Sequence, residues 1–301
     1  MSSRWTAYDS VPRRRARALA RLVRPMLTPA FYPTVGVTSA YWWDGHPNFG
    51  DGLTPWLFQR YGRIAVHSDP RAARLAGVGS ILEQLAPDFS GTVWGSGLLY
   101  GEPYDLPHAR YAAVRGHLTR SVQGLEHPLA LGDPGLLVSR HVPQPPQQWV
   151  LGLVPHGMHL DHPDVQRFAA RHPTEVRLID AGGSVDSVVR EIAACAAVAS
   201  SSLHGLVIAD SFGIPASWFG LEPGLWGGSF KFRDYESVVT PGRTRRSTFE
   251  AESALSAVVA DAALADSECV AASVGQLEES LAQVEARQLP PFLALRARRL
   301  S

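Results

Sequence analysis

The sequence predicts an α/β protein with two domains, each built on a parallel sheet. Short apolar runs alternate with segments of helical periodicity along the 301 residues. Such alternation is typical of parallel sheets that helices cover on both faces. Residues 143–148 are proline-rich and lack apolar periodicity, which is typical of a linker. A chain of this length has room for roughly two domains, so we expect the active site in a cleft between them.

Composition argues against several classes of function. The formal net charge is +0, so we expect no nucleic-acid partner. Cys195 and Cys269 are the only cysteines; they make neither a disulfide framework nor a metal-ligand cluster, and we expect no metal and no cofactor. No stretch approaches the ~20 apolar residues that cross a bilayer. We see no secretory signal and expect a cytoplasmic protein.

Residues 1–32 form a basic segment. Six arginines between positions 13 and 24 are interleaved with alanine, leucine and valine. A short amphipathic helix of this kind can rest on an anionic membrane surface, which would place the protein peripherally at the inner face of a membrane. The alternative is a solvated, partly frayed helix.

The first domain is predicted to begin with a strand, a glycine-rich loop and a helix. Residues 34–43 are apolar and β-rich, residues 44–52 are polar with three glycines, and helical spacing follows over residues 53–61. In this layout, ligands bind at the carboxyl ends of parallel strands. Asn48 and Asp51 are ordinary turn and capping residues. Alternatively, Asp51 faces the cleft as a base or as an acceptor for a sugar hydroxyl.

Arg115 ends a short strand at residues 111–115 and precedes a helix that we expect Thr119 to cap. The guanidinium fork can bind a phosphate or a carboxylate through two parallel hydrogen bonds. A surface salt bridge is the alternative. Two glycine turns, at residues 77–80 and 93–97, lie beside other apolar runs but lack the glycine spacing of a dinucleotide site.

Residues 197–215 carry the strongest local signal of the second domain. A small-residue strand runs into Ser200, Ser201 and Ser202, and His204 stands at the start of an apolar helix. Serine hydroxyls cap helices, and the free N–H groups of a helix start favour an anion. A histidine at this place can transfer a proton. The pattern predicts an anion site with a proton-transfer group; the alternative is a capped core helix.

The glycine-rich stretch 220–229 leads to Lys231 and Arg233, which lie between aromatic residues. Lys231 is the only lysine of the chain. We expect this segment to be a loop that closes over a ligand, or alternatively a solvated surface loop. Apolar spacing over residues 250–287 predicts one or two closing helices.

Several motifs occur in an order that resembles the polysaccharide pyruvyl transferase family, most closely its bacterial exopolysaccharide branch. Each motif alone is weak, but the ordered set is specific and extends over roughly residues 35–240. The motifs are Asn48-Phe49-Gly50-Asp51, Gly95-Ser96-Gly97, Val114-Arg115-Gly116 with Thr119, Gly132-Asp133-Pro134, Val154-Pro155-His156, Ser200-Ser201-Ser202-Leu203-His204-Gly205 with Asp210 and Gly213-Ile214-Pro215, and Lys231-Phe232-Arg233-Asp234-Tyr235.

The resemblance implies two Rossmann-like domains arranged as in the GT-B glycosyltransferases. Residues 33–142 would form the acceptor side, residues 148–245 the donor side, and residues 246–301 the closing helices. Phosphoenolpyruvate would be the donor, and a sugar of a polysaccharide or lipid-linked oligosaccharide the acceptor. The products would be a pyruvate ketal and phosphate.

The resemblance also implies site residues. His204 is the expected general acid, because protonation of the enol carbon needs an acid that works near neutral pH. Asp51 or His156 would take the hydroxyl proton. The expected donor contacts are Arg115, Ser202, Leu203, His204, and Lys231 or Arg233. The expected acceptor-side cleft residues are Asn48, Asp51, His156 and Ser96.

Two rival functions stay open at this point. A glycosyltransferase on the same scaffold would use a nucleotide-sugar donor and release a nucleoside diphosphate. A non-catalytic protein of the same fold would bind glycan without releasing phosphate. The presence of Arg115, His204 and Lys231 together favours an enzyme.

Overall fold

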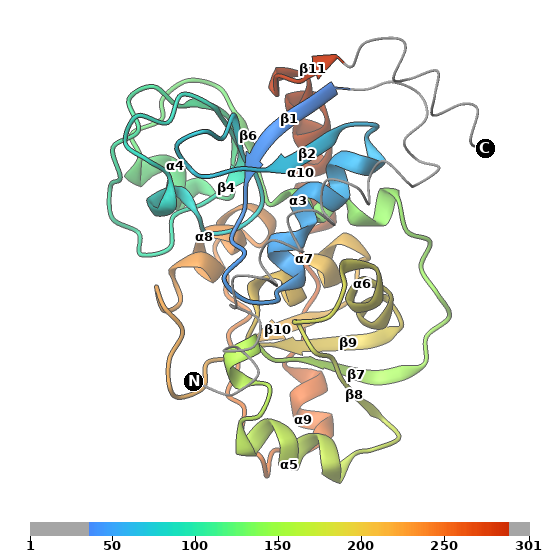
Figure 1. Ribbon diagram of the computed structural model, residues 1–301. Helices are drawn as coiled ribbons and strands as arrows, with labels where there is room; N and C mark the ends of the chain where they lie inside the picture. Colours follow the sequence, from blue (N-terminus) through green and yellow to red (C-terminus); the bar gives the residue numbers. More distant parts are fainter. Residues whose placement is uncertain (1–35, 289–301) are drawn as a thin grey trace, which may run out of the picture.

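The computed structural model describes residues 36–288 and shows two α/β halves, each built around its own sheet (Figure 1). The basic segment expected over residues 1–32 lies outside the described part of the chain. Helices of residues 36–288 include none that is both long and apolar enough to cross a membrane.

Six parallel strands form the sheet of the first half, in the order β2-β1-β3-β4-β5-β6. A further short strand, β11, runs antiparallel beside the start of β1. Ala40 of β1 pairs with His67 of β2 and with Leu75 of β3, so these strands flank β1 on opposite sides. The strands are β1 (Gly36–Tyr41), β2 (Ile64–His67), β3 (Leu75–Ala76), β4 (Thr92–Ser96), β5 (Arg110–Val114), β6 (Ala130–Leu131) and β11 (Arg287–Gln288).

The second sheet has the order β8-β7-β9-β10, and all its strands are parallel. β8 and β9 therefore flank β7 as β2 and β3 flank β1. In open parallel sheets, ligands bind beyond the carboxyl ends of the strands at such a reversal of strand order. Each half thus has one such reversal, called its switch point. It lies between β1 and β3 in the first half and between β7 and β9 in the second. The strands are β7 (Trp149–Val154), β8 (Val176–Leu178), β9 (Cys195–Ser200) and β10 (Ala216–Trp218).

Helices α3, α6 and α7 lie between the two sheets, and their apolar side chains form one core that joins the halves (Figure 1). Leu57 of α3, Ile192 of α6 and Leu206 of α7 are fully buried in it. Phe168 of α5 and Val258 of α9 belong to a separate core on the second sheet. The helices are α3 (Phe49–Arg60), α5 (Pro163–Arg171), α6 (Val185–Ala193), α7 (Leu203–Ser211) and α9 (Leu255–Ala260).

The last long helix, α10 (Ser267–Ser280), crosses back to the first half. Nε1 of Trp94 on β4 donates a hydrogen bond to Oγ of Ser280 at 3.0 Å. The closing segment was expected over residues 246–301, and its described part, residues 246–288, serves both halves, because α9 packs on the second sheet and α10 on the first.

The main departure from the sequence-based expectation is α8 (Phe230–Val239), which forms where we expected a loop. Phe232, Tyr235 and Val239 recur at helical spacing and are buried, which gives this segment an apolar side to pack. Lys231 therefore lies in the first turn of a packed helix.

Two helix starts also differ from the expectation. α3 begins at Phe49, before residue 53, because Asn48 caps it. α4 (His117–Val122) is N-capped by Gly116, whereas Thr119 lies inside its first turn. The hydroxyl of Thr119 is used in a different way, described below.

Candidate active site

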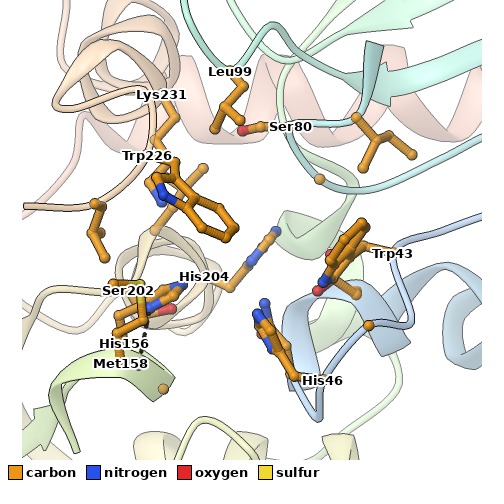
Figure 2. A pocket seen from close by; sticks show the side chains of 18 of the residues that line it. Trp43, His46, Ser80, Leu99, His156, Met158, Ser202, His204, Trp226 and Lys231 are labelled. Carbon is orange, nitrogen blue, oxygen red and sulfur yellow. Dashed lines mark hydrogen bonds between the residues drawn. The ribbon is translucent and has the colours of Figure 1, made fainter. Parts of the chain in front are cut away.

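A cavity of about 830 Å³ opens between the halves, where the two switch points face each other (Figure 2). Segments after β1 and β3 line it from the first half, and segments after β7 and β9 line it from the second. The stretch that leads into α8 adds Trp226, and the first turn of α8 adds Lys231. The cavity thus lies at the carboxyl ends of strands from both sheets, and its size suits small-molecule ligands.

Asp51 reaches this cavity from the first turn of α3. The side chain of Asn48 accepts a hydrogen bond from the N–H of Gly50 at 3.0 Å and also bonds the Asp51 carboxylate. Burial raises the pKa of Asp51 to about 7, against the charges of His204 and Lys231 and the Asn48 hydrogen bond. A carboxyl group that titrates near neutral pH suits acid–base catalysis.

The serine turn joins the ends of β7 and β9. Oγ of Ser200 accepts from the N–H of Ser202 at 3.0 Å and donates to the carbonyl of Val154 at 2.8 Å. Oγ of Ser201 accepts from the N–H of His156 at 2.9 Å. Ser202 is the N-cap residue of α7, as predicted, but its hydroxyl makes no capping bond and lines the cavity. The start of α7 therefore presents free N–H groups and a hydroxyl to a ligand.

His204 lies between the cavity and a buried carboxylate. Nε2 of His204 is 3.6 Å from Oδ2 of Asp133, and within the described residues neither atom has a hydrogen-bond partner. Oδ1 of Asp133 accepts from the N–H of Gly135 at 2.8 Å, which fixes the carboxylate. A Cβ at Gly50 would lie 2.0 Å from Nδ1 of His204, so glycine leaves the space for the ring. Asp133 is thus placed to orient the imidazole and to stabilise its protonated form.

His156 lines the same cavity. Burial lowers its pKa to about 3, with a further contribution from the charge of Lys231. Nδ1 of His156 accepts from the N–H of Met158 at 3.3 Å. The imidazole is neutral at neutral pH and a weak base, which favours Asp51 over His156 as the group that takes a hydroxyl proton.

Lys231 lines the cavity from the first turn of α8 and is only 9% exposed. Burial lowers its pKa to about 8, the charge of Arg115 lowers it further, and Asp51 opposes the change. Its ammonium makes no hydrogen bond or ion pair within residues 36–288. A charged group that is desolvated and unpaired is well placed to bind an anion.

Arg115 is fully buried behind the cavity and does not line it. Its Nε donates to Oδ2 of Asp234 at 2.8 Å, and its Nη2 donates to the carbonyl of Leu98 at 2.6 Å. Its Nη1 donates to the hydroxyl of Ser80, which does line the cavity. The guanidinium reaches the cavity only through Ser80 and through its charge on Lys231.

Two more expected site residues lie away from the cavity surface. Ser96 is buried, and its hydroxyl donates to the carbonyl of Gly79 at 2.9 Å, so it supports the turn after β3. Arg233 is exposed and absent from the cavity wall. Of the two basic candidates on α8, the geometry therefore favours Lys231. The other expected site residues line the cavity: Asn48, Asp51, His156, Ser202, Leu203, His204 and Lys231.

Sequence reasoning missed Asp133, Trp43 and Trp226. Asp133 stands between a glycine and a proline, a pattern typical of a turn. Its partner His204 is distant in sequence, so no local pattern indicated their contact. Trp43 ends an apolar run and resembles a core residue in sequence. Trp226 stands in a glycine-rich stretch, and an aromatic residue among glycines was the one available signal.

Comparison with known proteins identifies relatives of the chain. The family described as polysaccharide pyruvyl transferase matches residues 104–223. The succinoglycan biosynthesis protein ExoV of Rhizobium meliloti is 29% identical over 211 residues, which cover 66% of this chain and 64% of that protein. An uncharacterized protein of Acanthamoeba polyphaga mimivirus is 29% identical over 160 residues, 48% of this chain and 54% of that protein. The chain thus spans less than two thirds of the length of either relative.

Proposed function

We propose that this chain, which is similar to the polysaccharide pyruvyl transferase family over residues 104–223, moves the pyruvyl group of phosphoenolpyruvate onto two hydroxyls of one sugar. A pyruvate ketal forms and phosphate is released. The sugar would belong to a polysaccharide or a lipid-linked glycan, in keeping with the relative named for succinoglycan biosynthesis. The observation that carries the proposal is the meeting of Asp51, His204 and Lys231, from three separate segments, in one cavity.

The donor needs at least two groups that attract anions, because it carries a phosphate and a carboxylate. Lys231 supplies a full positive charge, and the start of α7 supplies free N–H groups and the hydroxyl of Ser202. Both are largely removed from solvent, where the lower dielectric strengthens the attraction. We assign these two groups to the donor.

Proton transfer is assigned to His204 and Asp51. His204 protonates the methylene carbon of the donor, which becomes a methyl group and leaves positive charge on the neighbouring carbon. Asp133 stabilises the imidazolium before this transfer. The first sugar hydroxyl attacks the charged carbon, and Asp51 accepts its proton.

The remaining steps complete the ketal. The carbon–oxygen bond to phosphate breaks, and the second sugar hydroxyl attacks the same carbon. Of the two hydroxyl protons, one replaces the proton given by His204 and the other leaves with phosphate as hydrogen phosphate. The balance closes without a further reactant.

The test is an incubation with phosphoenolpyruvate and a panel of glucosides, galactosides and N-acetylmannosaminides, both soluble and lipid-linked. We expect release of inorganic phosphate together with a product heavier by one pyruvyl group. His204→Ala should abolish both signals, whereas Arg233→Ala, on the exposed side of α8, should leave them unchanged. No phosphate release across the panel, or nucleoside diphosphate released from a nucleotide sugar, would contradict the proposal.

A further inference from the structure

The cavity is larger than the donor requires. At about 30 Å³ per water-sized group, the ~10 non-hydrogen atoms of phosphoenolpyruvate fill only roughly a third of it. Asp51, His204 and Lys231 give the cavity its ionic groups. The wall of the same cavity also carries aromatic and imidazole rings, among them Trp43, Trp226 and His156. The volume that the donor leaves free has room for another ligand.

Trp226 is held in an exposed position. Its side chain is 67% exposed, more than the other large hydrophobic residues of the described chain that lie at the surface. Nε2 of His159 pairs with the carbonyl of Pro223 at 2.9 Å and ties the loop to the second half. On the other side, Gly227 has φ +73 and approaches the first half so closely that a Cβ would lie 2.1 Å from the carbonyl oxygen of Leu99. The loop is thus anchored to both halves, and it holds the Trp226 indole at the cavity wall.

Trp43 borders the cavity from the end of β1. In the view of Figure 2, the indoles of Trp43 and Trp226 stand on either side of the cavity. Gly45 packs against the indole of Trp43, since a Cβ there would lie 2.4 Å from the ring. The ring of His46 meets Trp43 edge-on, with 6.2 Å between centroids. These neighbours fix the indole while it contributes to the cavity wall.

Hydrogen-bonding groups lie among these rings. Nδ1 of the neutral His156 accepts from the N–H of Met158, so its Nε2–H is left to donate to a ligand, and its ring lies 6.4 Å from that of His46. Asp161 and His162 also line the cavity. A hexose presents apolar C–H faces and a rim of hydroxyls, so indoles combined with neutral polar groups complement it better than they complement a hydrocarbon chain.

We propose that these rings of the cavity wall form the acceptor subsite, in which a hexose stacks on Trp226 and Trp43 and Nε2–H of His156 donates to one of its hydroxyls. The inference rests on the proposed function, because a ring held there presents a pair of hydroxyls toward Asp51 and His204. It assigns recognition of the acceptor to residues from both halves, beyond the acceptor side expected in the first half alone.

The experiment measures sugar binding without donor, so that its outcome is separate from that of the phosphate-release assay. Saturation-transfer NMR and calorimetric titration are run with methyl glycosides of glucose, galactose, mannose and N-acetylmannosamine. We expect at least one to receive saturation at its ring protons. Trp226→Ala should weaken that binding about tenfold, and Trp226→Phe should retain most of it, because stacking needs a ring. Tyr100→Ala, another exposed aromatic outside the cavity wall, serves as the matched control and should bind normally.

Three results would overturn the inference. The first is that none of the methyl glycosides binds the wild-type protein. The second is equal binding by wild type and Trp226→Ala. The third is a loss in Trp226→Ala that affects decyl glycosides but spares methyl glycosides, which would show that the indoles hold a lipid chain. Phosphoenolpyruvate binding should be the same in wild type and Trp226→Ala, and a loss there would also contradict a subsite for the acceptor alone.

Discussion

Asp51 occupies the first turn of α3, where the helix dipole favours an ionised carboxylate. Its burial acts in the opposite direction and raises its pKa to about 7. Lys231 shows the converse effect, because burial lowers its pKa to about 8. The proposed base and the proposed anion-binding cation therefore titrate close together, with the carboxylate ionised and the ammonium still charged over a narrow range of pH.

This order of pKa values predicts a bell-shaped pH dependence. We expect kcat/KM for phosphoenolpyruvate to rise with pH around 7, as Asp51 loses its proton, and to fall around 8, as Lys231 loses its charge. Phosphate release measured between about pH 5 and 10 gives the profile. Lys231→Arg should move the falling limb to higher pH, because a guanidinium stays charged. A falling limb that stays in place in this variant would contradict the role of Lys231.

The contact between Asp133 and His204 gives a second prediction about single residues. Asp133→Asn keeps an oxygen that can accept from the N–H of Gly135 but removes the charge beside Nε2 of His204. We expect kcat to fall by about 10- to 1000-fold, since the imidazolium loses its stabilising partner. KM for phosphoenolpyruvate should change little, because Asp133 does not line the cavity. A rise in KM at constant kcat would show that Asp133 serves binding instead.

At the scale of elements, α8 is fixed from both halves. The carboxylate of Asp234 accepts from the N–H and the hydroxyl of Thr119 on α4, at 2.8 and 2.7 Å, and from Nε of Arg115. On the other side, the hydroxyl of Tyr235 donates to Oδ2 of Asp210 on α7 at 2.8 Å. These contacts set the position of Lys231, so Arg115 supports the proposed donor site through Asp234 as well as through Ser80.

Arg115→Met tests this arrangement. The variant leaves Asp234 buried without its cation, and breaking a buried pair in this way costs about 3–5 kcal/mol. We expect urea unfolding to show a loss of that size, with a higher KM for phosphoenolpyruvate and a falling pH limb shifted upward, because Lys231 no longer feels the charge of Arg115. Arg233→Met, exposed on the same helix, is the control. A higher KM with unchanged stability would instead support direct contact between Arg115 and the donor, as the resemblance implies.

The helices and strands differ in how well the sequence alone predicted them. The alternation of apolar runs and helical periods predicted both parallel sheets, because that signal is local. The first turn of α7 at Ser202 and His204 was predicted for the same reason. α8 was taken for a loop, since its helical side is stabilised by partners such as Asp210 and Thr119 that are distant in sequence. The burial of Arg115 depends on Asp234 in the same way and has no local signature.

At the scale of the whole molecule, the candidate active site is a cavity lined by residues of both halves. Asp51 and Trp43 follow β1, Ser202 and His204 follow β9, and Lys231 lies on the helix that bonds to both halves. The shared core of α3, α6 and α7 holds the two switch points opposite each other. Donor binding should therefore join the halves more tightly, since the proposed donor site combines Lys231 with the start of α7.

Hydrogen exchange can measure that coupling. We expect phosphoenolpyruvate to slow amide exchange in residues 200–205 and 226–232, and also in residues 48–51 of the first half, because Asp51 borders the same anion. At a ligand concentration of about 100 times Kd, the protein should gain about 2.7 kcal/mol of stability. Lys231→Met should lose both the protection and the gain, whereas Arg233→Met should keep them. Protection confined to residues 200–205 would mean that the donor binds the second half alone. That result would contradict a donor site formed by residues of both halves.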